Sequence, residues 1–314
     1  MKCKYETENY KPYQKPKLQS WHHRAGYVGL PLLWTFHEKG FPVMGFDIDQ
    51  SKIDAINSGK TYIKHFGDEN IQKLAASDRC DLSTDFSDVS KVDAVLICVP
   101  TPLSKYREPD VSYVEGTVRS MASHIKKGQL IVLESTTYPD TTEELIKPIC
   151  EELNGMKAGE DFFLAYSPER EDPGNASFNT ATIPKVVGAD GEDAKAIAMA
   201  IYSGVISQAV PVSDTKTAEA VKLLENIFRS VNIALVNELK VVFEQMDIDI
   251  YEVIYAAKTK PFGFMPLPEH PLHRTGRGDK HRHAQVRAAA HPGSPERPRE
   301  SPEQFKGAVR RAGL

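Results

Sequence analysis

The sequence of 314 residues has few cysteines and no long apolar segment. Its four cysteines form no C-x-x-C pair, and none of them lies after Cys150. This pattern excludes a disulfide framework and favours a reducing compartment. No run reaches the about 18 apolar residues that a membrane-spanning helix needs, and residues 1–23 are too polar for a secretion signal. We therefore expect a cytoplasmic protein that does not enter the membrane.

An excess of charge of one sign is also lacking, since the formal charge is only −4. This balance gives no general attraction to nucleic acid or to anionic lipid, so neither partner is expected. The charge is unevenly distributed, because residues 267–314 carry +5 and residues 1–266 carry −9. Residues 267–314 also contain no Ile, Tyr, Trp, Met or Cys. This composition predicts a disordered tail, and its histidines, without cysteine or a helical frame, do not predict a metal site.

Between residues 24 and 266, short β-branched segments alternate with amphipathic ones, a pattern typical of a parallel sheet covered by helices. The segments 94–99 (AVLICV) and 130–133 (LIVL) are apolar without interruption, as expected of strands buried on both faces. The segment 19–23 (QSWHH) shows no such character. Strands are predicted at 42–47, 94–101, 130–136, 162–167 and 185–188, and helices at 30–39, 51–57, 111–124, 142–153 and 193–202.

After Ser213 the pattern changes to one long helix, for which Ser213 or Asp214 is a plausible N-cap. Apolar residues recur at spacings of three and four through about nine turns. A helix of this length usually joins domains or packs against a partner subunit. We therefore expect a homo-oligomer formed through this helix. The apolar positions are Ala218, Val221, Leu224, Phe228, Val231, Leu235, Leu239, Val242 and Met246.

A glycine motif and an acidic residue together predict a dinucleotide site. Gly26 and Gly29 fit the last two glycines of G-x-G-x-x-G, although Arg24 stands at the first position. Asp47 follows Gly29 by 18 residues, at the end of a predicted strand. In such folds the glycines let the backbone approach the pyrophosphate at a helix N-terminus, and the acidic side chain accepts hydrogen bonds from the ribose. An acidic residue here also favours NAD over NADP, whose 2′-phosphate it would repel.

Eight motifs follow one another along the sequence: GYVGLPL (26–32), GFDID (45–49), CVPTP (98–102), ESTTYP (134–139), YSPEREDPGN (166–175), IPKVVG (183–188), AEAVKLLENIFRSVNIALVNEL (218–239) and KPFGFMP (260–266). In this order they resemble the UDP-glucose/GDP-mannose dehydrogenase family. The stretch SPEREDPGN points to its UDP-N-acetylhexosamine 6-dehydrogenase branch, with UDP-glucose 6-dehydrogenase as the alternative. A different dehydrogenase of similar plan, such as the 6-phosphogluconate type, agrees less well with the SPER and ESTTYP stretches.

The resemblance implies an NAD-dependent oxidoreductase that converts the sugar 6-hydroxymethyl group to a carboxylate, in a cytoplasmic pathway of polysaccharide biosynthesis. It places Thr136 and Glu169 near the sugar C6, with Glu169 a candidate base, and makes Lys222 and Asn226 the pair that stabilises the oxyanion. These two residues are four apart in a helix, so both project from one face. Lys185 is interpreted as a sheet-edge lysine without a role. The cofactor contacts implied are Gly26, Tyr27, Val28, Asp47, Val99, Thr101 and Thr136.

The resemblance stops after Pro266. The family continues there with the catalytic motif G-G-H-C, whereas this sequence has no further cysteine. We therefore expect a Rossmann-type doubly wound α/β sheet, then a long central helix and an all-α segment, with the C-terminal domain missing through truncation or a shifted reading frame. Full activity is not expected, and a remnant that only binds NAD or pairs with intact subunits is the alternative. The predicted division is a non-family segment at 1–23, an NAD-binding domain at 24–212, a partial central domain at 213–266 and a non-family tail at 267–314.

Overall fold

The computed structural model describes the backbone of residues 20–23 and, in full, residues 28–63, 66–102, 105, 109–170 and 180–261. The chain divides into two compact units, residues 1–224 and 225–314. The predicted tail at 267–314 and the glycine motif residues Gly26 and Tyr27 lie outside the described residues.

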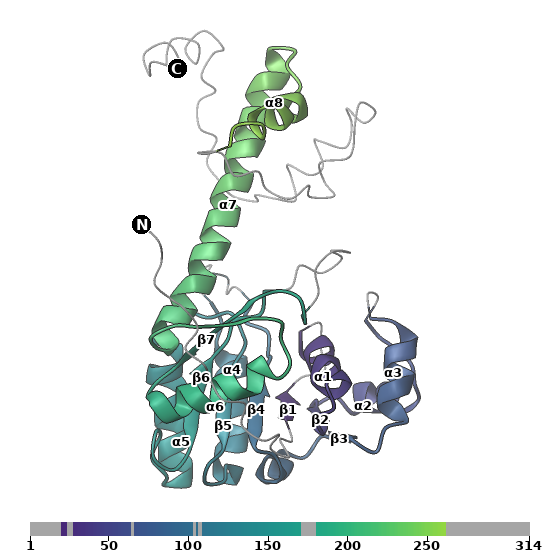
Figure 1. The fold of residues 1–314 in the computed structure, drawn as a ribbon, viewed down its shortest axis with the longest axis vertical. Helices are drawn as coiled ribbons and strands as arrows, with labels where there is room; N and C mark the ends of the chain where they lie inside the picture. The colour runs from purple at the N-terminus through teal and green to yellow at the C-terminus, as the bar shows by residue number, and fades with distance from the viewer. Residues whose placement is uncertain are drawn as a thin grey trace. The chain divides into compact units, whose positions relative to one another are not determined.

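The first unit is built on an eight-stranded sheet with the order β3-β2-β1-β4-β5-β6-β7-β8 (Figure 1). Neighbouring strands from β3 to β6 run parallel, β7 is antiparallel to β6, and β8 is parallel to β7. The first strand, β1, lies inside the sheet; β2 and β3 extend the sheet to one edge, and β4 to β8 extend it to the other. This order is the one predicted for a doubly wound fold. The strands are β1 (Ser20–His23), β2 (Val43–Phe46), β3 (Cys80–Ser83), β4 (Ala94–Ile97), β5 (Leu130–Leu133), β6 (Phe163–Tyr166), β7 (Lys185–Ala189) and β8 (Ala209–Pro211).

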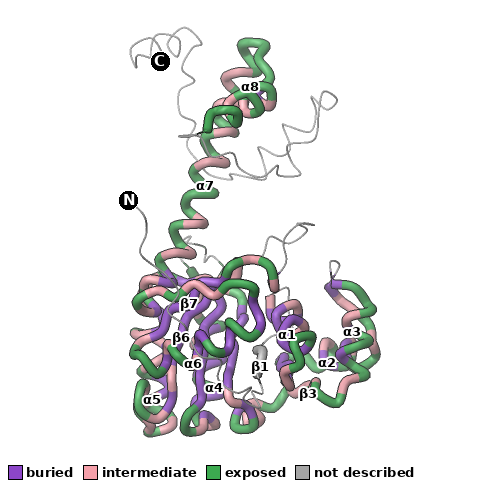
Figure 2. The backbone as a smooth tube through the Cα atoms, viewed as in Figure 1, coloured by how far each residue is buried: buried purple, intermediate pink, exposed green. Residues whose placement is uncertain are grey.

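Alternate residues of the central strands supply two separate cores, one on each face of the sheet. In β4, Ala94 and Leu96 belong to one cluster, and Val95 and Ile97 belong to the other. Successive side chains of a strand point to opposite faces, so a strand buried on both faces must be apolar throughout. All residues of β4 and β5 are buried, and Figure 2 shows the burial concentrated on the sheet. The prediction of doubly buried strands is confirmed.

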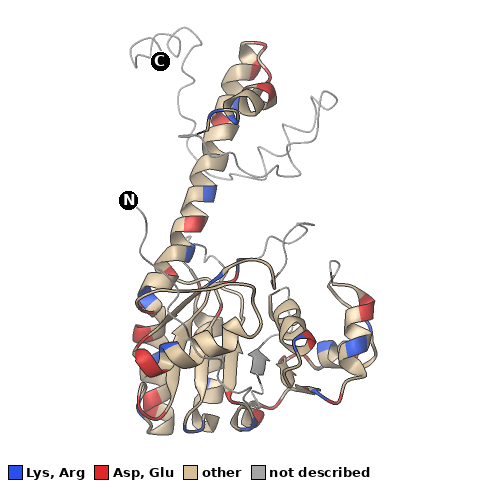
Figure 3. Cartoon of the chain, viewed as in Figure 1, with Lys and Arg blue, Asp and Glu red and all other residues tan. Residues whose placement is uncertain are grey.

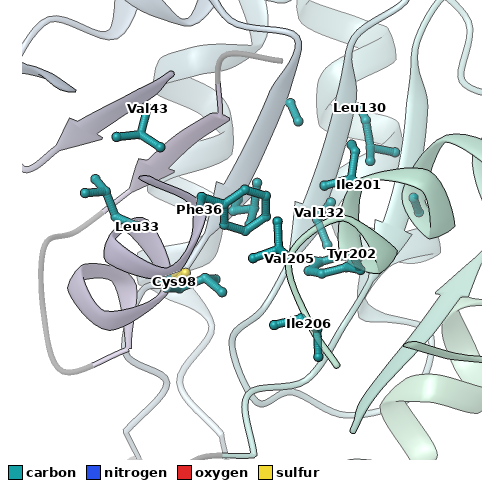
Figure 4. Packing of buried hydrophobic residues seen from close by; sticks show 14 of the residues in the cluster. Leu33, Phe36, Val43, Cys98, Leu130, Val132, Ile201, Tyr202, Val205 and Ile206 are labelled. Atoms are coloured by element: carbon teal, nitrogen blue, oxygen red, sulfur yellow. The ribbon is translucent and has the colours of Figure 1, made fainter. Parts of the chain in front are cut away.

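Helices cover both faces. Residues of α1, α2, α3 and α6 enter one cluster, and residues of α4 and α5 enter the other. In the first cluster the ring of Phe36 meets Tyr202 edge to face at 6.4 Å, and Figure 4 shows Val205 and Ile206 beside them. The charged residues of α3 and α5 are visible in Figure 3. The helices are α1 (Gly29–Glu38), α2 (Gln50–Asn57), α3 (Asp68–Ala75), α4 (Ser112–Met121), α5 (Lys147–Asn154) and α6 (Glu192–Ser203), with 3₁₀ turns η1 (Phe86–Lys91) and η2 (Ala122–His124) and a π-helical turn η3 (Thr142–Ile146).

The expectation that residues 19–23 lack a strand is wrong. β1 lies between β2 and β4, and Trp21 is in register with Met44 and Val95. A polar segment can form a strand because strand preference depends on the neighbours that it pairs with more than on its own residues. The edge strands β3 and β8 and the helix α3 were also not predicted. β3 is only partly buried, so it lacks the uninterrupted apolar pattern of the inner strands.

The long helix predicted after Ser213 is α7 (Thr215–Gln245), and it is followed by α8 (Ile250–Ala257). The N-terminus of α7 is fixed by two carboxylates: Asp214 accepts a hydrogen bond from the Thr217 backbone at 2.7 Å, and Asp190 accepts one from the Thr215 hydroxyl at 2.7 Å. The boundary between the two units falls within α7, after Leu224. Among the helices that the structure describes, none combines the length and apolar character needed to cross a membrane.

Candidate functional site

The first part of the candidate site is the crossover from β1 to β2 through α1. Val28 occupies the N-cap position of α1, and its apolar side chain cannot accept a hydrogen bond from the first turn. The N–H groups of a first helical turn are therefore left for another acceptor, which is the arrangement that binds a phosphate. Val28 lies where the sequence analysis placed a cofactor contact.

Asp47 follows β2 directly, as predicted, and its side chain is completely buried. One carboxylate oxygen accepts a hydrogen bond from the Asp49 backbone at 3.0 Å, and the other pairs with the Lys52 ammonium at 2.8 Å. A carboxylate has about four lone-pair sites, so these two contacts do not use its full acceptor capacity. Lys52 is an unpredicted neighbour that fixes the orientation of the carboxylate.

The ends of β4 and β5 form the second part of the site. The Thr101 hydroxyl donates a hydrogen bond to the Thr136 carbonyl at 2.6 Å, and the Ser135 hydroxyl donates one to the Val99 carbonyl at 2.7 Å. Thr101 and Thr136 are partly exposed, whereas Val99 is buried. The structure therefore brings together three predicted residues that lie on two segments about 35 residues apart. This is the edge of a parallel sheet where ligands of such folds lie.

The loop after β6 carries Glu169, whose side chain is 12% exposed. Its backbone N–H donates to the Glu134 carbonyl at 3.4 Å. The Lys222 ammonium, from the first turns of α7, donates a hydrogen bond to the main-chain carbonyl of Glu169. Two predicted catalytic residues thus meet within the first unit. Asn226 lies four residues further along α7, in the second unit, and is partly exposed.

A buried charged cluster, which we call the Lys185 cluster, adjoins Glu169 and was not predicted. It consists of Glu134, Lys185 and Tyr202, each nearly or completely buried. The Lys185 ammonium lies 2.5 Å from one Glu134 oxygen, and the Tyr202 hydroxyl donates to the other. The same ammonium lies 3.7 Å from a carboxylate oxygen of Glu169. One cation therefore faces two carboxylates in the interior.

Burial and mutual charge shift the proton affinities of this cluster. Burial raises the pKa of Glu134 to about 7, against the opposing effect of the Lys185 cation. Burial acts to lower the pKa of Lys185, but the carboxylates of Glu134 and Glu169 outweigh it, so the net direction is upward. Burial also raises the pKa of Tyr202 well above its ordinary value. Lys185 is therefore charged at neutral pH, and Glu134 is the group that titrates there.

The interpretation of Lys185 as a sheet-edge lysine is wrong. It begins β7, which lies between β6 and β8, and it is 4% exposed. The sequence held a usable signal, because Glu134 directly follows the fully buried LIVL strand and Lys185 directly precedes the apolar VVGA. Charges of opposite sign next to two buried strands are expected to pair, because an unpaired charge is too costly in the interior.

Residues 24–206 match the NAD binding domain of the UDP-glucose/GDP-mannose dehydrogenase family, and residues 216–273 match its central domain. The chain is 36% identical over 243 residues to the UDP-N-acetyl-D-glucosamine 6-dehydrogenase of Pseudomonas aeruginosa, covering 77% of this chain and 56% of that protein. It is 37% identical over 236 residues to the protein CapL of Staphylococcus aureus, covering 75% of this chain and 54% of that protein.

Among solved structures, the UDP-D-ManNAc dehydrogenase of Pyrococcus horikoshii is similar, with a TM-score of 0.75 and 33% identity over 80% of this chain and 60% of that one. The present chain thus spans little more than half the length of these relatives. The match to the central domain extends seven residues beyond Pro266, where the resemblance had been expected to stop.

Proposed function

Since the chain belongs to the UDP-glucose/GDP-mannose dehydrogenase family, we propose that it acts as the NAD-binding and sugar-oxidising part of a UDP-N-acetylhexosamine 6-dehydrogenase. The observation that carries this proposal is the contact of Lys222 with the Glu169 carbonyl, on a loop whose Glu169 N–H donates to Glu134, two residues before Thr136. The N-acetylhexosamine preference is taken from the names of relatives that are UDP-N-acetyl sugar dehydrogenases.

The described residues fit a dinucleotide. The open first turn of α1 suits the pyrophosphate, the buried Asp47 suits the adenosine ribose, and Val99 and Thr101 lie at the next strand end. We propose that Thr136 contributes to the cofactor site as well as to the sugar site. When bound, NAD supplies the acceptor for the hydride that leaves the sugar C6.

On the sugar side of the site, we propose that one carboxylate and one cation assist the oxidation. Glu169 supplies a carboxylate that can take the proton of the 6-hydroxyl group. Lys222, on α7 and hydrogen-bonded to the Glu169 main-chain carbonyl, supplies a cation for the developing negative charge at oxygen. Asn226, one helical turn from Lys222, is the proposed second donor. The product of this single step is an aldehyde.

A second oxidation to the carboxylate needs a nucleophile, and the described cysteines do not suit that task. Burial raises the pKa of Cys80 and of Cys150 to about 12, and it raises that of Cys98 well above its ordinary value. The thiolate is the reactive form, so burial disfavours the reactive form of these three side chains. We therefore propose the first oxidation as the step that the described residues support.

The test follows NADH formation spectroscopically with excess NAD and either UDP-N-acetylglucosamine or UDP-N-acetylmannosamine, with UDP-glucose as the comparison. We expect no more than one NADH per UDP-sugar, with the aldehyde trapped by hydroxylamine. Two NADH per sugar would contradict the single-oxidation proposal. NAD binding without any NADH would contradict sugar oxidation and support the second candidate.

The second candidate is a chain that only binds NAD. This candidate is favoured by the raised pKa values of the described cysteines, because none of them then readily supplies the thiolate that the second oxidation needs. Thermal unfolding separates the outcomes, because a ligand that binds the folded state stabilises it by RT ln(1 + [L]/Kd). A rise in melting temperature at millimolar NAD supports a formed site, and its absence would overturn both candidates.

We also propose a cytoplasmic homo-oligomer held through the second unit. Within residues 225–261 several large apolar side chains are exposed, among them Phe228, Val231 and Leu235 on α7. Their spacing of three and four residues places them along one side of the helix. Sedimentation velocity at increasing protein concentration is expected to show association.

A further inference from the structure

The Lys185 cluster has no role in the chemistry proposed so far, yet it lies against the loop that carries Glu169. Besides its contact with Glu134, the Lys185 ammonium approaches the main-chain carbonyl of Pro168 at 3.3 Å and that of Ser167 at 3.5 Å. Its distance to the Glu169 carboxylate is 3.7 Å. One buried ammonium therefore contacts three consecutive residues of the loop, Ser167, Pro168 and Glu169.

The position of the ammonium is itself fixed from the opposite side. Glu134 follows β5, Lys185 begins β7, and Tyr202 belongs to α6, so three elements converge on this point. The Tyr202 hydroxyl holds the second oxygen of Glu134, and the Lys185 ammonium lies 5.6 Å from the Tyr202 ring centre. A charged side chain held from several elements has little freedom to move. The contacts of the Lys185 ammonium with the loop are therefore fixed by the fold.

The loop also depends on this corner for its backbone. The Ser167 N–H donates to the Leu133 carbonyl at 3.0 Å, and the Glu169 N–H donates to the carbonyl of Glu134. The Ser167 hydroxyl donates to the Val186 carbonyl at 2.8 Å, next to Lys185. Leu133 and Val186, which are next to Glu134 and Lys185 in sequence, thus also accept hydrogen bonds from the loop. The ionic and the backbone contacts therefore hold the same segment.

We propose that Lys185, anchored by Glu134 and Tyr202, is a positioning residue that holds the segment 167–169 and fixes the orientation of the Glu169 carboxylate. This inference rests on the proposed function only for the role of Glu169. The positioning itself is a property of the folded chain, so it can be measured whether or not the sugar is oxidised.

The first experiment measures amide hydrogen exchange in the full chain. Loss of one partner of a buried ion pair is strongly destabilising, so the informative variant is the double substitution Lys185→Met with Glu134→Gln, which removes both charges. We expect exchange of the amides of Ser167, Glu169 and Arg170 to become at least about ten times faster, while the amides of β4 stay unchanged. Lys185→Arg, which keeps the cation, is expected to restore most of the protection.

The matched control is Lys195→Met, on α6, whose ammonium pairs with Glu192 and is more exposed than that of Lys185. It is expected to leave exchange unchanged at both places. Unchanged exchange of residues 167–170 in the double variant would overturn the positioning role. An equal increase in β4 and in the loop would overturn it too, because it would indicate general loss of stability.

The second experiment measures single-turnover NADH formation with UDP-N-acetylglucosamine. In the double variant we expect a rate at least about tenfold lower with an unchanged Kd for NAD, and Lys185→Arg is expected to restore most of the rate. An unchanged rate in the double variant would contradict the role of Lys185. If the unmodified chain forms no NADH, the proposed function fails, and the exchange experiment still decides the positioning.

Discussion

The two units differ in what they leave exposed. In the first unit even charged groups are buried, with Glu134 at 1% and Lys185 at 4% exposure. In the second unit large apolar side chains face outward, with Val231 at 60% and Leu235 at 54%. The sheet has thus enough surrounding structure to enclose a charged pair, whereas α7 and α8 do not enclose their own apolar surface. A contiguous exposed apolar patch usually marks a contact with another molecule.

The two units are also expected to differ in how strongly single substitutions change their stability. A buried charge is tolerated only when it is paired, so the Lys185 cluster makes the first unit sensitive to single substitutions. Substitution of an exposed apolar residue changes the free energy of unfolding little, unless a partner molecule covers that residue. The following predictions test this contrast, starting with the largest effect.

Replacing Lys185 with methionine is expected to lower the free energy of unfolding by about 3–5 kcal/mol, because Glu134 is left buried without its cation. Replacing Lys195 with methionine is expected to change it by no more than about 0.5 kcal/mol. Urea denaturation followed by tryptophan fluorescence gives both values, since Trp21 and Trp34 both lie in the first unit. Equal stability of the two variants would show that the cluster is not a paired buried charge.

Two leucine substitutions compare the cores of the units. Leu96→Ala, at a completely buried position of β4, is expected to cost about 2–5 kcal/mol at any protein concentration. Leu235→Ala is expected to have an effect that is small in dilute solution and grows with protein concentration, because association buries the residue. Circular dichroism over a range of concentrations measures this. A large effect of Leu235→Ala in dilute monomer would mean that the second unit already buries this side chain.

The pH dependence of stability tests Glu134. Its pKa is raised from 4.5 to about 7 in the folded state, so between these values the folded protein keeps a proton that the unfolded chain has released. The free energy of unfolding therefore falls as the pH rises through this window, by up to about 1.4 kcal/mol per pH unit. Glu134→Gln is expected to remove this slope, and Glu192→Gln, at a 91% exposed side chain, is expected to retain it. An unaltered slope in Glu134→Gln would assign it to other groups.

The smallest effect concerns His37, whose pKa is lowered by burial and by the Arg79 cation. Its ring lies 2.7 Å from the Ser77 hydroxyl. Because the unfolded chain binds a proton more readily, this contribution to stability is complete above pH 6.5 and declines as the pH falls below that value. His37→Gln is expected to lose less stability than the unmodified chain between pH 6.5 and 5. A steeper loss in the variant would contradict the assignment.

Local patterns predicted most of the fold. The uninterrupted apolar segments gave β4 and β5, and the recurrence of apolar residues gave α7 with nearly correct ends. They could not give β1, because its polar residues form a strand only between β2 and β4. For the site, the motifs named Thr101, Thr136, Glu169 and Lys222, and the structure brings Thr101 to Thr136 and Lys222 to Glu169.

The sequence by itself determined the family and the strongly patterned elements such as β4, β5 and α7, because helical and strand periodicity and the order of motifs are local properties of the chain. Only the tertiary structure decided which charged groups are neighbours. Glu134 and Lys185 are 51 residues apart, and Tyr202 lies 68 residues from Glu134. They meet because the sheet order places β6 between β5 and β7 while α6 covers that face. In a low-dielectric interior such groups are stable only when they are paired, and the order of the strands together with the packing of α6 determines which partners are available.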